Sequence, residues 1–265
     1  MGTFTFKLLD WIDPNNLYWE ALSVNANAIT MLENNPRNVS WKFLSKNPDA
    51  TKLLKENLDK VDWERICRFS KDMSLIEANP DKIIWFWLSD NEHAIQLLEE
   101  NLDKVYWDWL CFNKAAIHLL EQNPQKINWG FLSENENAIT MLSENIDKID
   151  WKYLSRNVNA ISLLEANVDK IDWTELSCNI NAISLLAANP DKINWSKLSG
   201  NYNAMSLLEA NPDKIDWNML AINTNIRAIE LLEKNQEKIN WYFLSMNTSI
   251  FVKVEGINEE VNETL

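Results

Sequence analysis

The chain has 265 residues, of which 46% are hydrophobic, and a formal net charge of −14. Fourteen tryptophans in so apolar a composition exclude an intrinsically disordered chain, because disordered chains lack the residues that build a core. Four glycines are too few for a fold rich in glycine turns and phosphate-binding loops, and the negative charge disfavours nonspecific binding to nucleic acids or anionic membranes. We therefore expect a folded, helical chain whose partners are neutral or basic proteins.

Residues 1–18 are predicted to form an N-terminal cap that corresponds to half a repeat. The segment KLLDWIDPNNLY has Leu8, Leu9, Pro14 and Leu17 near the places that the second half of the repeat described below requires. The N-terminus lacks the basic region and long apolar stretch of a signal peptide, and no segment reaches the roughly 18 consecutive apolar residues of a membrane span. Three cysteines in different repeats do not fit a disulfide framework. We expect an intracellular protein that is not secreted.

Residues 19–250 are predicted to be an array of about eleven tandem repeats of 22 residues. Each repeat begins with a tryptophan, and the spacing is 22 residues over nine intervals and 24 over the last. These residues are Trp19, Trp41, Trp63, Trp85, Trp107, Trp129, Trp151, Trp173, Trp195, Trp217 and Trp241. With the tryptophan as position 0, the unit reads W-x-x-L-S-x-N-x-N-A-I-x-L-L-E-x-N-P-D-K-I-D. Such units bury their apolar faces only against their neighbours, which predicts a solenoid.

Each repeat is predicted to contain two helices. The first carries the tryptophan and the leucine at position 3, follows a polar N-cap residue, and is short and possibly 3₁₀. The second is expected to start at the asparagine at position 8, to bury the A-I-x-L-L stripe, and to end at the asparagine at position 16 in the left-handed conformation, often before a proline. We therefore predict an all-α fold, an α-solenoid in the form of a rod or superhelix. The alternative is a leucine-rich-repeat horseshoe, which the missing L-x-L alternation disfavours.

Position 2 of the first helix carries aromatic residues at intervals of about one repeat. They are Phe43, Trp87, Trp109, Phe131, Tyr153 and Phe243. Tryptophan at position 0 and leucine at position 3 already define the buried face, so these rings suit an exposed stripe that binds a peptide or helix. The other interpretation is a second packing layer between adjacent repeats, and the sequence alone leaves both open.

The repeat that begins at Trp63 departs from the pattern. Phe69 replaces the asparagine at position 6, and Arg65, Arg68 and Lys71 gather in an otherwise acidic chain. This local basic patch is suited to docking an acidic segment of a partner. Sequence drift in one tolerant repeat explains the same residues without a function.

Three further features are a lysine that recurs along the chain, a two-residue insertion and the C-terminal segment. A lysine recurs near the end of most repeats, from Lys60 to Lys238, usually beside aspartates, which predicts a solvated, salt-bridged edge instead of a nucleic-acid contact. The two-residue insertion in NTNIRAIE, between Asn223 and Arg227, is expected to bulge a loop and to kink the stack. Residues 251–265 are predicted to form a degenerate C-terminal cap and an acidic tail.

Arrays such as NPDKIDWKYLSRNVNAISLLEANVDKIDW resemble the short Asn-, Trp- and Leu-rich tandem repeats encoded by large DNA viruses of algae and amoebae. The resemblance covers roughly residues 7 to 250. It implies a viral setting, with the protein in the host cytoplasm or the virion, and an α-solenoid, and it implies no activity. A looser similarity to bacterial leucine-rich-variant repeats, which alternate α and 3₁₀ helices, concerns the fold only.

The chain offers little for catalysis. His93 and His118 occupy different repeat positions without metal-ligand spacing, and no nucleophile, phosphate-binding or dinucleotide motif is present. We expect no enzyme activity, no cofactor and no metal. The predicted function is a scaffold that binds a protein or peptide partner, with no nucleic acid and no membrane, through variable solenoid positions. The alternative is a structural component of a virus particle or viral factory.

Overall fold

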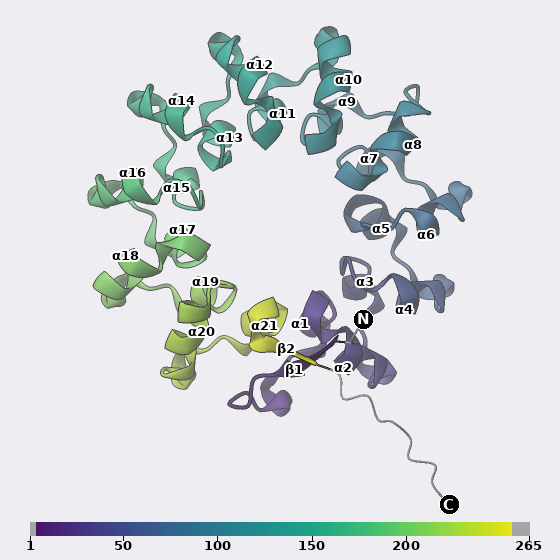
Figure 1. Ribbon diagram of the computed structural model, residues 1–265, viewed down its shortest axis with the longest axis vertical. Coiled ribbons are helices and arrows are strands. Elements are labelled where there is room, and N and C mark those ends of the chain that lie inside the picture. The colour runs from purple at the N-terminus through teal and green to yellow at the C-terminus, as the bar shows by residue number, and fades with distance from the viewer. Residues whose placement is uncertain (1–3, 256–265) are drawn as a thin grey trace, which may run out of the picture.

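The protein is described by a computed structural model that covers residues 4–255, and in it the solenoid closes into a ring (Figure 1). Each of the first ten repeats contributes one helix to an inner layer and one to an outer layer, and the eleventh contributes an inner helix. The inner helices are α1 (Trp19–Leu22), α3 (Trp41–Leu44), α5 (Trp63–Phe69), α7 (Trp85–Leu88), α9 (Trp107–Leu110), α11 (Trp129–Leu132), α13 (Trp151–Arg156), α15 (Trp173–Leu176), α17 (Trp195–Ser199), α19 (Trp217–Ala221) and α21 (Trp241–Met246). The outer helices are α2 (Ile29–Glu33), α4 (Thr51–Lys55), α6 (Ser74–Glu77), α8 (Ile95–Glu99), α10 (Ile117–Gln122), α12 (Ile139–Ser143), α14 (Ile161–Glu165), α16 (Ile183–Ala187), α18 (Met205–Ala210) and α20 (Ile226–Glu233).

Short 3₁₀ helices flank the outer helices. Those that precede an outer helix are η2 (Ala26–Ala28), η6 (Glu92–Ala94), η7 (Lys114–Ala116), η9 (Glu136–Ala138) and η13 (Tyr202–Ala204). Those that lead to the next inner helix are η1 (Pro14–Asn16), η3 (Pro36–Asn38), η4 (Leu58–Lys60), η5 (Pro80–Lys82), η8 (Pro124–Lys126), η10 (Ile146–Lys148), η11 (Val168–Lys170), η12 (Pro190–Lys192), η14 (Pro212–Lys214) and η15 (Gln236–Lys238). A last one, η16 (Thr248–Ile250), precedes the C-terminal strand. The prediction of an all-α solenoid of two-helix repeats is confirmed, and the first helix of each repeat is α-helical instead of 3₁₀.

The core lies between the two layers and runs around the ring. The leucine at position 3 of the inner helix, as in Leu154, and the second leucine of the outer helix, as in Leu164, are fully buried. The alanine at position 9, as in Ala160, is also buried, and its small side chain lets the outer helix approach its neighbours closely. Helices of four to six residues are not stable alone, so this packing between adjacent repeats stabilises them.

A buried asparagine at position 6 links every repeat except the one that begins at Trp63 to the repeat before it. Its Nδ2 donates to the carbonyls of positions 4 and 6 of the preceding repeat, as Asn157 does to Ser133 and Asn135 at 3.1 and 2.9 Å. Its Oδ1 accepts the backbone N–H two residues later, as from Asn159 at 3.0 Å. The side chains of this asparagine ladder belong to Asn25, Asn47, Asn91, Asn113, Asn135, Asn157, Asn179, Asn201, Asn223 and Asn247.

Two predicted roles of other asparagines are wrong. Except for Asn225, the asparagine at position 8 does not cap the outer helix: α14 begins after Ala160 without a side-chain cap, and the position-6 side chain of Asn157 accepts the N–H of Asn159 in the turn before it. Asn159 instead donates Nδ2 to the carbonyl of Glu136 at 3.0 Å. The asparagine at position 16 is not left-handed: Asn167 has φ −138° and ψ 51°, and its Nδ2 donates to the carbonyl of Leu163 at 2.9 Å. That side-chain bond satisfies a carbonyl at the helix end, so no left-handed residue is needed there.

The ring closes because the two ends of the chain contact each other through the same bonds that join neighbouring repeats. Inner helices α1 and α21 pack together. Asn25 donates Nδ2 to the carbonyls of Ser245 and Asn247 at 3.1 and 2.9 Å, which continues the asparagine ladder across the seam. The backbone N–H of Tyr18 donates to Ser245 Oγ at 2.9 Å, as the corresponding N–H groups do elsewhere in the ring.

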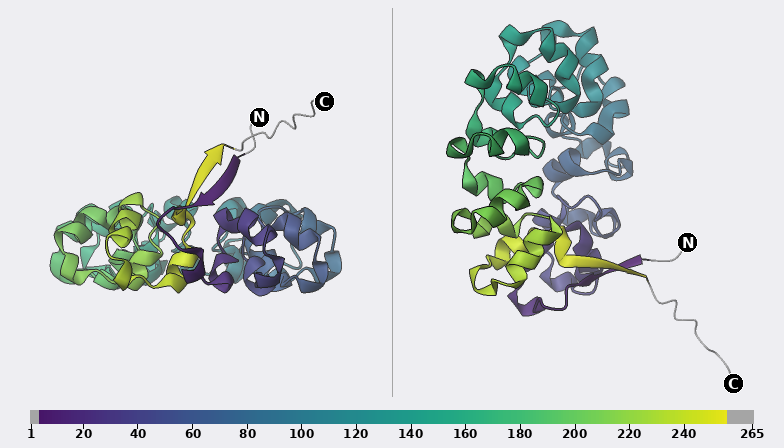
Figure 2. Two further views of the ribbon diagram at one scale, coloured as in Figure 1. Left: turned by 90° about the horizontal axis from the view of Figure 1, so that it is seen from below. Right: turned by 60° about the vertical axis from the view of Figure 1, so that its left-hand side comes forward.

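The eleventh repeat is built from both ends of the chain. Its first half is α21 and η16, and its second half is supplied by residues 9–18. In that segment Ile12 and Leu17 are buried, and the ring centroid of Trp11 lies 6.4 Å from that of Trp241. Outside the repeat, β1 (Phe4–Leu8) pairs antiparallel with β2 (Phe251–Glu255), with Leu8 opposite Phe251. These strands project from one face of the ring (Figure 2). The predicted acidic tail, residues 256–265, lies outside the described residues.

The two-residue insertion does not form the bulged loop that the sequence predicted. It replaces the 3₁₀ segment with helix, so that α20 has eight residues and is capped by Asn225, whose side chain accepts the N–H of Arg227 at 3.0 Å. The ladder continues through this repeat, because Asn247 still donates to the carbonyls of Ala221 and Asn223 at 2.8 and 2.9 Å. The extra residues are accommodated in the outer layer.

Candidate binding surface on the inner face

Positions 1, 2 and 5 of the inner helices face the centre of the ring. In an α-helix of 3.6 residues per turn these three positions lie opposite positions 0, 3 and 4. Position 3 and position 4 are buried against the outer layer, as Leu132 and Ser133 are, and Figure 1 shows that the outer helices lie on the far side of the inner ones. Variable residues at positions 1, 2 and 5 therefore determine the chemistry of the inner face.

Seven aromatic side chains form one continuous cluster over the repeats that begin at Trp85, Trp107, Trp129 and Trp151, here repeats 4–7. Adjacent ring centroids lie between 4.8 and 6.4 Å apart, in tilted, edge-to-face and stacked arrangements. The members of this aromatic cluster are Phe86, Trp87, Tyr106, Trp109, Phe112, Phe131 and Tyr153. Tyr106 is 51% exposed, and the other six are half-buried.

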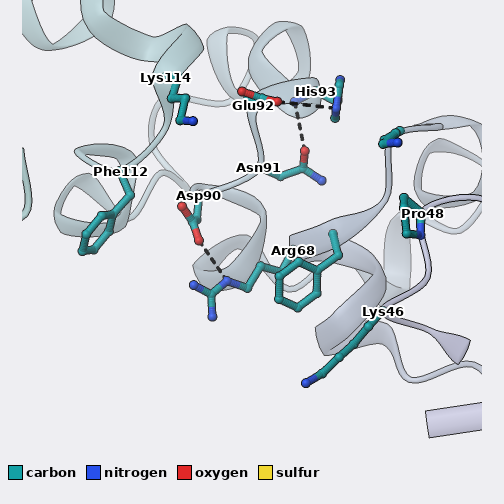
Figure 3. A pocket seen from close by; sticks show the side chains of 11 residues that line it. Lys46, Pro48, Arg68, Asp90, Asn91, Glu92, His93, Phe112 and Lys114 are labelled. Carbon is teal, nitrogen blue, oxygen red and sulfur yellow. Dashed lines mark hydrogen bonds and ion pairs between the residues drawn. The ribbon is translucent and has the colours of Figure 1, made fainter. Parts of the chain in front are cut away.

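Arg68 lies at one end of the aromatic cluster. Its guanidinium carbon is 5.2 Å from the ring centroids of Phe69, Trp87 and Trp109, which is the distance of a cation–π contact. Its Nε donates to the Asp90 carboxylate at 2.9 Å, as Figure 3 shows. Burial raises the pKa of Asp90, and the charge of Arg68 opposes that rise.

A second group of charges lies at the other end of the aromatic cluster. Arg156 contacts two carboxylates, Glu134 at 3.5 Å and Glu175 at 3.1 Å, and Lys197 also reaches Glu175 at 3.1 Å. Burial raises the pKa of Glu134; Arg156 opposes this, while the negative charges of Glu175 and Asp90 add to it. The aromatic cluster is thus bounded on both sides by arginine–carboxylate contacts.

Three pockets overlap on this part of the inner face, and Arg68 lines all of them. The largest has a volume of about 540 Å³, with Lys46, Lys71 and Lys114 among its walls (Figure 3). A smaller one of about 170 Å³ lies between Phe69 and Trp87. The third, of about 470 Å³, lies on the aromatic cluster between Asp90 and Glu134. The inner face of repeats 2–7 is therefore hollowed and carries both aromatic and charged walls.

The irregular repeat at Trp63 shapes these pockets. Without an asparagine at position 6, α5 continues to Phe69, and Ser70 ends the helix. Asn91 accordingly donates to the carbonyls of Cys67 and Ser70, at 3.0 and 2.9 Å, so the ladder is shifted at this step. Phe69 is 41% exposed and lines the first two pockets beside Arg68.

The structure brings together only part of the predicted site. Trp87, Trp109, Phe131, Tyr153 and Arg68 belong to one surface, as described above. Arg65 and Lys71 have acidic partners of their own, Asp62 and, at 3.9 Å, Asp49, but each also lines a pocket beside Arg68. Phe43 lies apart from the aromatic cluster, with its ring centroid 5.8 Å from the Lys46 amine. Within residues 4–255, Arg65 Nε is the only buried side-chain polar atom that lacks a hydrogen-bond partner.

Phe86, Phe112, Asp90, Glu134 and Arg156 were missed by the sequence analysis. They occupy positions 1 and 5, where most repeats carry polar or small residues, so no repeated aromatic signal marks them. Positions 2 and 5 are three residues apart and share a helix face, and that relation was the available signal.

The predicted salt-bridged edge is wrong for most of its lysines. Within the described residues, eight of them lie over the tryptophan that starts the same repeat, at 4.4 to 6.0 Å from its ring. Several also donate to the asparagine at position 16, as Lys148 does to Asn145 at 2.9 Å. Lys82 alone pairs with its neighbouring aspartate, Asp81, at 3.2 Å. These lysines cover the half-buried tryptophans.

Among the described residues, no group of three or more His, Cys, Asp and Glu side chains is arranged to hold a metal ion. None of the helices between residues 4 and 255 has both the length and the hydrophobicity needed to span a membrane. Comparisons of the chain with protein-family models, with curated proteins and with solved structures gave no match.

Proposed function

We propose that this chain is a non-catalytic, ring-shaped binding protein that holds a segment of a protein partner against the inner face of repeats 4–7. The observation that carries the proposal is the aromatic cluster, which places seven contiguous, partly exposed rings on this surface, whereas repeats 8–10 have no aromatic residue at positions 1, 2 or 5. Exposed aromatic surfaces with an arginine beside them are typical of the energetic centres of binding sites.

The aromatic cluster is not needed to build the ring. Repeats 8–10 have Glu175, Lys197 and Met219 at position 2, yet they keep the same buried leucines and the same asparagine ladder. An inner face that needs no aromatic rings in three repeats has them in four consecutive repeats. This difference supports a binding role for the rings.

The dimensions of the ring favour a partner that inserts a single chain segment and not a folded domain. Eleven inner helices spaced by about 9 Å place their axes on a circle about 30 Å across. Helices with their side chains are about 10–12 Å thick, which leaves about 20 Å between opposite inner faces. An extended peptide or a single helix fits this opening, whereas a folded domain does not.

The proposal is tested by affinity capture from the native cell with three proteins. The first is the wild type and the second carries Trp87→Ala, Trp109→Ala and Phe131→Ala. The third is a matched control with Met219→Ala, Tyr242→Ala and Phe243→Ala, which are half-buried residues at inner-face positions of repeats 10 and 11. We expect the wild type and the control to retain a partner that the first variant loses, with circular dichroism unchanged in all three.

Two results would contradict the proposal. Equal capture by all three proteins would show that the aromatic cluster is not the binding surface. Recovery of the protein only as part of a large particle, unaffected by either triple variant, would favour a structural component of a virus particle or viral factory. If the first variant alone unfolds, the rings belong to the core, and single substitutions of Trp109 and Tyr153 repeat the test.

A further inference from the structure

The third pocket of the inner face has a composition of its own. Four rings line it, from Trp109, Phe112, Phe131 and Tyr153. Its charged walls are Arg68, Asp90, Glu134 and Arg156, and it contains no lysine. Aromatic faces together with carboxylates are the surroundings in which proteins bind ammonium groups.

The charges are arranged in order around Phe112. Position 5 of five successive repeats carries Arg68, Asp90, Phe112, Glu134 and Arg156. The carboxylates of Asp90 and Glu134 therefore lie in the repeats next to the Phe112 side chain, and the two arginines lie one repeat farther out on either side. A ligand that contacts Phe112 meets the two acids first.

Both arginines already have their charges matched. Arg68 is held by Asp90 and by three aromatic rings, and Arg156 is shared between Glu134 and Glu175. Glu134 has only the 3.5 Å contact with that shared guanidinium. The four charged walls balance, and Glu134 is the least closely paired of them, so it is the carboxylate that can still accept a further cation.

The electrostatics agree with this geometry. The pKa values of Asp90 and Glu134 are both raised, first by burial, and for Glu134 also by the charges of Glu175 and Asp90. Two partly dehydrated carboxylates that repel each other across a pocket are stabilised by a cation placed between them.

We propose that this pocket binds the ammonium group of a lysine side chain in the partner segment, against the rings and between Asp90 and Glu134. The inference rests on the proposed function and names the chemistry that the aromatic cluster recognises. The net charge of −14 attracts a basic segment toward the ring as a whole. An acidic side chain suits the neighbouring pocket with Lys46, Lys71 and Lys114 better than this one.

The experiment uses the full chain and three short peptides that differ at one residue. Acetyl-Gly-Gly-X-Gly-Gly amides with lysine, norleucine or glutamate at X are titrated at about pH 8, well above the ordinary pKa of a carboxyl group. Nuclear magnetic resonance of the indole N–H groups gives one signal for each of the fourteen tryptophans. We expect the lysine peptide to shift the signal of Trp109, the tryptophan that lines the pocket, and to leave those of Trp195 and Trp217 unchanged.

Two charge variants sharpen the test. Glu134→Gln keeps the shape and removes the charge, and we expect it to weaken binding of the lysine peptide about tenfold. Arg156→Gln leaves Glu134 without its cation, and we expect it to strengthen binding. Glu144→Gln, an exposed acid at the end of the outer helix of the same repeat as Glu134, is the matched control and should leave the affinity unchanged.

Other outcomes overturn the inference and leave the proposed function to be decided separately. If the glutamate peptide shifts Trp109 and Arg156→Gln abolishes that shift, the pocket selects anions, and the aromatic cluster is still a binding surface. If the lysine and norleucine peptides bind equally, the site recognises the apolar part of the side chain and not its charge. If no peptide shifts any signal, the lysine pocket is rejected, while affinity capture with the triple variants still decides whether the inner face binds a partner.

Discussion

At the scale of single residues, the asparagine at position 6 explains why the repeat is so regular. One side chain satisfies two carbonyls of the preceding repeat and one N–H of its own, and all of these groups are buried or nearly so. No other side chain of similar size offers two donors and one acceptor in that geometry. A buried polar backbone group without a partner costs about 1–3 kcal/mol, so substitutions at this position are disfavoured.

The charges of the inner face are also arranged residue by residue, and Glu134 gives a pH-dependent prediction. Its pKa is raised by burial and by the facing charges of Glu175 and Asp90, against the opposing effect of Arg156. The folded state therefore binds the Glu134 proton more tightly than the unfolded state does. Its contribution to stability is full below the ordinary pKa of 4.5 and is lost as pH rises through the raised value.

We expect Glu134→Gln to remove this loss. The free energy of unfolding of the variant should increase relative to that of the wild type as pH rises above about 4.5, because only the wild type must ionise a buried acid. Urea unfolding at several pH values measures the difference. If the difference in the free energy of unfolding is constant with pH, or if the variant becomes less stable than the wild type as pH rises, Arg156 fully compensates the burial of the carboxylate.

At the scale of single elements, α5 differs from the other inner helices for a reason that a single residue supplies. Phe69 stands where the ladder asparagine should be, and the helix runs three residues beyond the four-residue inner helices. The exposed Phe69 ring and Arg68 then line the pockets of the inner face. The irregular repeat thus lacks the hydrogen bonds of a ladder asparagine and has an exposed ring on the inner face instead. Such departures from the stabilising pattern are common at functional sites.

The substitution Phe69→Asn tests this exchange. A restored asparagine can donate to the carbonyls of Ser45 and Asn47, which should stabilise the fold by about 1–2 kcal/mol. It should also shorten α5 and weaken binding at the inner face. Urea unfolding and partner capture measure the two effects, with Phe69→Ala as the control that removes the ring without rebuilding the ladder. If the two variants have equal stability, the missing ladder step has no energetic cost.

The helices could be predicted from the sequence because their signals recur. Tryptophan and leucine three residues apart, after Asp150 or Asp172, marked the inner helices, and both aspartates are N-caps in the structure. The asparagines were harder, since Asn157 and Asn159 are both suited to capping and only the path of the backbone distinguishes them. Phe112 carries no repeated signal, because an aromatic residue occurs once at its position and two of its three ring partners, Phe131 and Tyr153, belong to other repeats.

At the scale of the whole molecule, closure follows from the rotation between neighbouring repeats, which a sequence does not display. A full turn divided by eleven repeats is about 33° per repeat, and a slightly different angle or pitch would give an open superhelix. The sequence did show an N-terminal half-repeat, and in the ring this segment completes the repeat that begins at Trp241. In the ring every repeat has two neighbours, so neither end of the array is left to fray.

Closure makes a quantitative prediction about two equivalent asparagines. Asn25 spans the seam and Asn135 lies far from it, yet both donate to two buried carbonyls at 2.9 to 3.1 Å. In a closed ring, Asn25→Ala and Asn135→Ala should each lower the free energy of unfolding by about 3 kcal/mol, because each leaves the same backbone groups unpaired. Urea unfolding measures both. In a solenoid that is open in solution the Asn25 amide already faces water, so a cost for Asn25→Ala well below that for Asn135→Ala would show that the seam does not hold and that the inner face belongs to an open arc.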